Sequence, residues 1–183
     1  MAVIKSYARR AVARIPSVLF GFLVAGALLQ AVPSPAQVEY EDPKIGGVGH
    51  LLEPTRPTVS LPNSMVRVYP VRKDALDDQI QSFPLTIISH RLGELFSIMP
   101  NDGEPTAAAW QGSAVYDQEK ATPYYYSVRL EDSGILVEFT PTARCGYFRF
   151  TFPSGKPVVL LANRRTGDLT LAGTNAFNGI ERF

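Results

Sequence analysis

Carboxylate side chains are the first residues in this chain whose chemistry could support a reaction. Two carboxyl groups, one acting as an acid and the other as a base, can together drive hydrolysis of a polar bond. Nothing in their spacing singles out a pair here, so the sequence assigns no catalytic residue. The candidates considered are Glu94, Asp102, Glu104, Asp117, Glu119 and Glu131.

Two histidines and one tryptophan are the candidate ligand-binding residues. His50 and His90 lie too far apart in sequence to predict a metal site by spacing. Each could line a ligand pocket or be a hydrogen-bonded structural residue. Trp110 lies in a Gly/Ala/Gln setting that favours a loop, where an indole can stack on the C–H face of a sugar ring. The alternative for Trp110 is ordinary packing.

Cys145 is the single cysteine of the chain, so no intramolecular disulfide can form. It lies in a short link between two β-rich runs. We predict that it is buried as a small apolar residue rather than used as a nucleophile.

The elements that must position these side chains are mostly strands. Three β-rich runs in the second half of the chain, separated by short turns, predict an antiparallel meander. These runs are Tyr124–Leu130, Ile135–Thr140 and Gly146–Phe152. Further short strands are expected at Ser64–Val71, Leu85–Ser89, Leu95–Met99, Val158–Asn163 and Leu169–Leu171.

The density of turn residues supports the same class of fold. Fifteen prolines and fourteen glycines punctuate the sequence, which suits short strands better than long helices. Val158–Asn163 (VVLLAN) is expected to be a central strand that is buried on both sides. The prediction is an all-β protein, a β-sandwich or curved double antiparallel sheet.

Four segments carry a family resemblance, in the same order as the family motifs. They are Asp42–Gly46 (DPKIG), Ser89–Gly93 (SHRLG) followed by Ile98–Pro100, Glu119–Leu130 (EKATPYYYSVRL) and Val137–Pro153 (VEFTPTARCGYFRFTFP). Together they resemble the N-terminal domain of glycoside hydrolase family 92, the calcium-dependent exo-acting α-mannosidases. Phe148 stands where many members of the family carry a histidine.

The resemblance implies a β-sandwich domain that packs on a large helical catalytic barrel and lines a site for α-mannosides. It implies that the acid, the base and the calcium ligands belong to that catalytic domain, so no catalytic residue, metal site or cofactor is expected on this chain. His50, His90 and Trp110 would then line the sugar site. Residues 37–183 would form the domain, incomplete at its C-terminal end, and we expect no mannosidase activity from this chain alone.

The first 36 residues predict a secretory signal peptide. Four basic residues, Lys5, Arg9, Arg10 and Arg14, precede the apolar run Val18–Leu29, and small residues follow up to Ala36. Cleavage after Ala36 would place the protein in the periplasm or outside the cell. A membrane anchor is the alternative, but the run is short for a bilayer span. The net charge of +1 gives no reason to expect nucleic acid as a partner.

A rival interpretation is a stand-alone secreted carbohydrate-binding β-sandwich that uses Trp110 and the tyrosines Tyr124–Tyr126. A third is a truncated gene product without a separate role. Under the main interpretation the isolated domain is expected to be weakly stable and prone to associate, because sheet edges and an apolar face would lack their partners.

Overall fold

Strands are the main regular elements of the computed structural model, which describes residues 37–44, 56–73, 77–89 and 93–182. Contacts divide the chain into two units, Met1–Gln37 and Val38–Phe183, and the strands named here lie in the second. Two short helices are η1 (Gln37–Tyr40) and α2 (Ala107–Gln111). The strands are β1 (Gln79–Ile80), β2 (Phe83–Ser89), β3 (Gly93–Asn101), β4 (Ala114–Thr122), β5 (Tyr125–Leu130), β6 (Leu136–Pro141), β7 (Gly146–Thr151), β8 (Val158–Ala162), β9 (Gly167–Leu171) and β10 (Phe177–Glu181).

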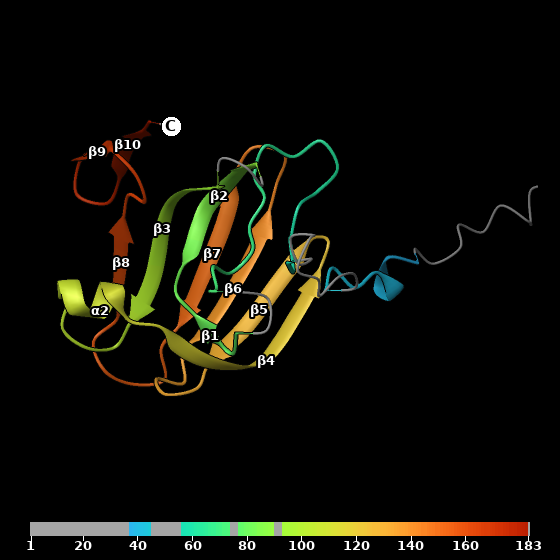
Figure 1. The fold of residues 1–183 in the computed structure, drawn as a ribbon, viewed down its shortest axis with the longest axis horizontal. Helices are drawn as coiled ribbons and strands as arrows, with labels where there is room; N and C mark the ends of the chain where they lie inside the picture. The colour runs from blue at the N-terminus through green and yellow to red at the C-terminus, as the bar shows by residue number, and fades with distance from the viewer. Residues whose placement is uncertain (1–36, 45–55, 74–76, 90–92, 183) are drawn as a thin grey trace, which may run out of the picture. The chain divides into compact units, whose positions relative to one another are not determined.

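The strands form curled antiparallel sheets, which confirms the predicted all-β class. A five-stranded sheet has the order β1-β4-β5-β6-β7, a three-stranded sheet has the order β2-β3-β8, and β9 pairs with β10 (Figure 1). The predicted meander is β5-β6-β7, each strand paired antiparallel with the next. Gly134 closes the β5–β6 turn with a φ of 67°, a left-handed conformation that glycine adopts without a steric penalty.

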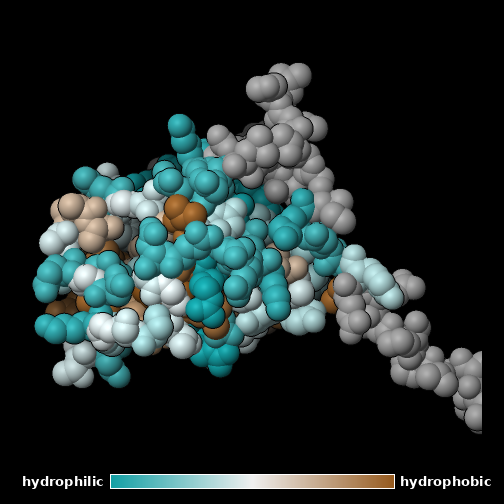
Figure 2. Space-filling model, turned by 90° about the horizontal axis from the view of Figure 1, so that it is seen from below, coloured by the Kyte–Doolittle hydropathy of each residue, from teal (hydrophilic) through white to brown (hydrophobic). Residues whose placement is uncertain are grey.

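The core lies between the five-stranded and three-stranded sheets. Alternate residues of β5 and β6 point inward and are fully buried, among them Val128 and Val137. Phe83 of β2 connects the two sheets, because its ring centroid lies 6.4 Å from that of Tyr126 and 6.5 Å from that of Phe148. The side of the molecule seen in Figure 2 is largely hydrophilic, with apolar residues in small separated groups.

A β-bulge interrupts β4 and changes which of its residues face the core. The register with β5 shifts between Asp117 and Lys120, and Gln118 has a φ of 54°. Regular alternation after the half-buried Tyr116 would turn Gln118 inward, but Gln118 is exposed and Glu119 is turned inward instead. The bulge thereby brings a carboxylate to the edge of the core.

Two strand predictions are wrong in detail. β8 is an edge strand of its sheet, and Val159 is 45% exposed, so the Val158–Asn163 segment is not a central strand buried on both sides. Ser64–Val71 is not a continuous strand. It contributes isolated bridges, Val59 with Val68 and Val71 with Ser82.

Cys145 is exposed, so the prediction of a buried cysteine is wrong. It ends the tight turn between β6 and β7, where Thr142 N donates to Cys145 O at 2.7 Å and Cys145 N donates to Thr142 Oγ1 at 3.0 Å. Because the turn satisfies its own backbone groups, it needs no cover from the core. Among the described residues, no helix has the length and apolar character to span a bilayer.

Candidate functional site

Trp110 lies in α2 rather than in a loop. Thr106 caps this short helix, since its Oγ1 accepts from Ala109 N at 3.1 Å. Trp110 is half-buried and packed against the core. The structure therefore shows the packing contact of the indole, and its role toward a ligand stays a prediction.

His50 and His90 lie outside the described residues, but Arg56 and Glu94, which follow them in sequence, come together. Arg56, a few residues after His50, lies 4.0 Å from a carboxylate oxygen of Glu94, a few residues after His90. The Arg56 guanidinium also donates to Tyr69 Oη at 2.6 Å and lies 4.6 Å above the Tyr69 ring. Two segments far apart in sequence thus meet at one partly exposed charged cluster.

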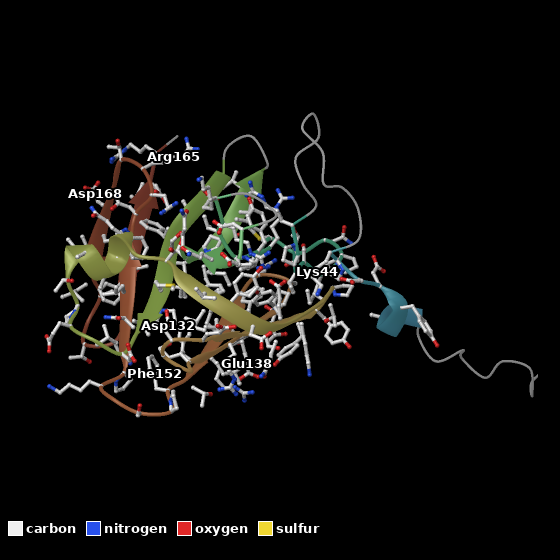
Figure 3. All side chains as sticks on the ribbon, turned by 60° about the horizontal axis from the view of Figure 1, so that its bottom comes forward. Lys44, Asp132, Glu138, Phe152, Arg165 and Asp168 are labelled. Carbon is white, nitrogen blue, oxygen red and sulfur yellow. The ribbon has the colours of Figure 1, made fainter. Side chains whose placement is uncertain are left out.

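The β9–β10 hairpin is held against the start of β3 by a carboxylate. Glu181 of β10 accepts from Phe96 N at 2.7 Å and from Arg165 N. Phe96 has a φ of 43°, which is strained for an aromatic residue. A Cβ atom at Gly179 would lie 2.4 Å from the Phe96 ring, so only glycine fits there. Figure 3 labels Arg165 and Asp168 at this hairpin.

The six candidate carboxylates are distributed over different elements. Glu119 is paired with Arg72 and accepts from Tyr126 Oη at 2.8 Å. Glu94 is engaged by Arg56, as described above. The other four carry exposed side chains: Asp102, Glu104, Asp117 and Glu131. These positions assign no acid–base pair. Among the described residues, no group of three or more His, Cys, Asp or Glu side chains is placed to hold a metal ion.

A site that the sequence analysis missed lies on the outer face of the meander, opposite the core. Glu138 is cross-strand to Arg149, and Thr140 is cross-strand to Tyr147. Arg149 donates from Nε and Nη2 to the two Glu138 oxygens, both at 2.5 Å. Tyr125 Oη donates to Glu138 Oε1 at 2.7 Å. Figure 3 shows Glu138 beside the strands of this sheet.

The alternation of strand residues was the available signal for this site. In the two runs Ile135–Thr140 and Gly146–Phe152, the polar residues occupy every second position opposite the apolar ones. Identifying their partners requires the strand register, and the sequence analysis did not assign one.

Hydrogen bonding sets the charge state of this outer site. Hydrogen bonds from Arg149 and then from Tyr125 lower the pKa of Glu138 below its ordinary value of 4.5. Burial, followed by the hydrogen bond to Glu138, raises the pKa of Tyr125 above its ordinary value of 10.0. At neutral pH the site therefore holds a carboxylate, a guanidinium and a neutral phenol.

The family is shown by a match over most of the chain. Residues 40–180 match the sequence model of the glycosyl hydrolase family 92 N-terminal domain. The chain belongs to this family. The matched range includes the meander and both Arg56 and Glu94. No curated protein matches the chain.

Solved structures of family GH92 share the fold. An inverting mannosidase from Bacteroides thetaiotaomicron VPI-5482 is 25% identical with a TM-score of 0.67, over 80% of this chain and 22% of that one. An α-mannosidase from Bacteroides thetaiotaomicron is 25% identical with a TM-score of 0.53, over 68% of this chain and 20% of that one. The chain thus spans about a fifth of the length of these mannosidases.

Phe148, where many family members are expected to carry a histidine, is accommodated by aromatic packing. Its ring centroid lies 4.8 Å from Phe139 and 5.9 Å from Phe150. At this position an apolar ring adds to the core and leaves no polar atom to satisfy.

Proposed function

We propose that this chain acts as the N-terminal, non-catalytic domain of a family 92 α-mannosidase. In this proposal it forms a β-sandwich that packs on a helical catalytic domain and lines the site for α-mannosides. The family match across residues 40–180 carries the proposal. Hydrolysis, and the calcium that supports it, would be supplied by the catalytic domain.

The cluster around Arg56 and Glu94 supports a role beside the sugar. Glu94 directly follows the motif segment Ser89–Gly93, which contains His90, and Arg56 lies a few residues after His50. Polar groups that fix a sugar are commonly few and positioned by rigid elements. His50, His90 and Trp110 remain the proposed contacts to the mannoside.

The β9–β10 hairpin supports packing against a further domain. It exposes a run of large apolar side chains, and exposed apolar patches commonly mark a partner surface. Leu169, Leu171 and Phe177 lie on one face of the hairpin, and Ile180, paired with Asp168, lies on the other. Export to the periplasm or the outside of the cell, directed by the predicted signal peptide in residues 1–36, completes the proposal.

Mixing this chain with a separately expressed family 92 catalytic domain tests the proposal. We expect the chain alone to release no p-nitrophenol from p-nitrophenyl α-mannoside, with or without calcium, because no acid–base pair is assigned. We expect co-elution with the catalytic domain, lost in Leu171→Asp and kept in Tyr40→Asp, a control at another exposed apolar residue. Hydrolysis by the chain alone that disappears in Glu94→Gln would contradict the non-catalytic role.

A further inference from the structure

The outer face of the meander holds an open cavity that faces solvent. Two cross-strand rows, Glu138 with Arg149 and Thr140 with Tyr147, supply its walls together with Tyr125. The volume is about 460 Å³, within the range of roughly 300–1,000 Å³ typical of ligand sites. None of these residues belongs to the cluster around Arg56 and Glu94.

The charges at the base of this cavity are paired. The Glu138 side chain is only 9% exposed although it lies on the outer face of the sheet, and both its oxygens accept hydrogen bonds. Such a paired carboxylate cancels the positive charge of Arg149. A free anion therefore gains little here, and a neutral ligand avoids the desolvation of an unpaired charge.

The rim of the cavity offers the groups that a neutral polyhydroxyl ligand uses. The Arg149 side chain is 74% exposed, and its Nη1 has no partner among the described residues. Tyr147 is 61% exposed and presents an aromatic face beside it. An aromatic face contacts the C–H side of a sugar ring, while a guanidinium N–H donates to a hydroxyl.

We propose that Tyr147 and Arg149 form a carbohydrate-binding site for a neutral hexose chain. Glu138 and Tyr125 act as positioning residues, because they fix the guanidinium beside the aromatic ring. This inference goes beyond the proposed function and does not require a catalytic domain. Its role would be to hold a polysaccharide on the protein while other surfaces act on it.

Calorimetric titration and NMR titration of the full chain test the proposal. The probes are methyl α-mannoside, a soluble α-mannan, dextran as a second neutral chain, and polygalacturonate as an anionic chain. We expect the mannan or the dextran to bind, with polygalacturonate weaker. We expect Tyr147→Ala to weaken binding of the neutral chain at least about tenfold, equivalent to roughly 1.4 kcal/mol.

Tyr40→Ala is the matched control, because Tyr40 is a tyrosine that is 85% exposed and does not line the cavity. Its affinity should stay within about twofold of the parent, and Tyr147→Phe should retain most of the binding because the ring is kept. Thermal melts confirm that each variant is folded. Equal affinity of Tyr147→Ala and the parent, tighter binding of polygalacturonate, or no neutral probe bound at about 10 mM would each overturn the site.

Discussion

Two Arg–Glu pairs contact the five-stranded sheet, one on the core side and one on the outer face, and each carboxylate also accepts from a tyrosine. On the core side, Arg72 pairs with Glu119, and both side chains are 11% exposed. Tyr126 donates to Glu119, and the Arg72 guanidinium lies 4.4 Å above the Tyr116 ring. Both side chains are largely enclosed, so the contribution of this pair is to the fold.

On the outer face, the second pair is Arg149 with Glu138, and its guanidinium is open to solvent. Glu138 is nearly buried by Arg149 and Tyr125, yet Arg149 itself is 74% exposed. The pair is held in place without being covered. Comparing the two pairs shows that identical residue types can be enclosed by the fold on one side of a sheet and leave the guanidinium open to solvent on the other.

Breaking the inner pair should have the largest effect. In Glu119→Ala the buried Arg72 loses its counter-charge, and its Nε already lacks a hydrogen-bond partner among the described residues. We expect a loss of about 3 kcal/mol in the free energy of unfolding, measured by urea denaturation. Glu131→Ala, at an exposed turn, is the control and should change little. Similar values for both variants would mean that the inner pair does not support the fold.

Removing the tyrosine hydroxyl that donates to each carboxylate compares what this hydrogen bond contributes to stability on the two sides of the sheet. Tyr126→Phe deletes the buried hydrogen bond to Glu119 and should cost about 1 kcal/mol. Tyr125→Phe deletes the equivalent bond to Glu138 and should cost less, because water can replace the lost donor on the outer face. Chemical denaturation of the two variants decides this. A larger loss for Tyr125→Phe would reverse our ranking of the two sites.

Acid should remove the contribution of the outer pair. The pKa of Glu138 is lowered in the folded protein by hydrogen bonds from Arg149 and Tyr125, relative to an ordinary value of 4.5. The stabilisation is therefore fully present above that ordinary value and is lost as the pH falls through the folded pKa. We expect Glu138→Gln to lower the Tm by a few degrees at pH 7. The difference in Tm between this variant and the parent should become smaller below about pH 4.5. A gap that widens on acidification would contradict this sign.

The smallest effect is expected at the turn between β6 and β7, the strands that carry Glu138 and Arg149. Cys145 is exposed, and its backbone bonds to Thr142 do not involve the thiol. Cys145→Ser should change the free energy of unfolding by less than about 0.5 kcal/mol. Thermal melts under reducing conditions measure it, and a loss of several degrees would show that the thiol is packed in solution.

The sequence by itself determined the all-β class and the meander. Alternating β-rich runs bounded by glycine and proline form strands because period-two patterning exposes one face and buries the other. This local rule identified Tyr124–Leu130, Ile135–Thr140 and Gly146–Phe152 within a residue or two of β5, β6 and β7. The family motifs are equally local, and the match over residues 40–180 confirms the family.

Only the tertiary structure decided which charged residues meet. Arg72 and Glu119 are distant in sequence, and the bulge at Gln118 that turns Glu119 inward follows no local pattern. Register placed Glu138 opposite Arg149, while sheet order left β8 at an edge. Such facts depend on long-range pairing, whose free energy comes from burying both sheets together rather than from any one segment.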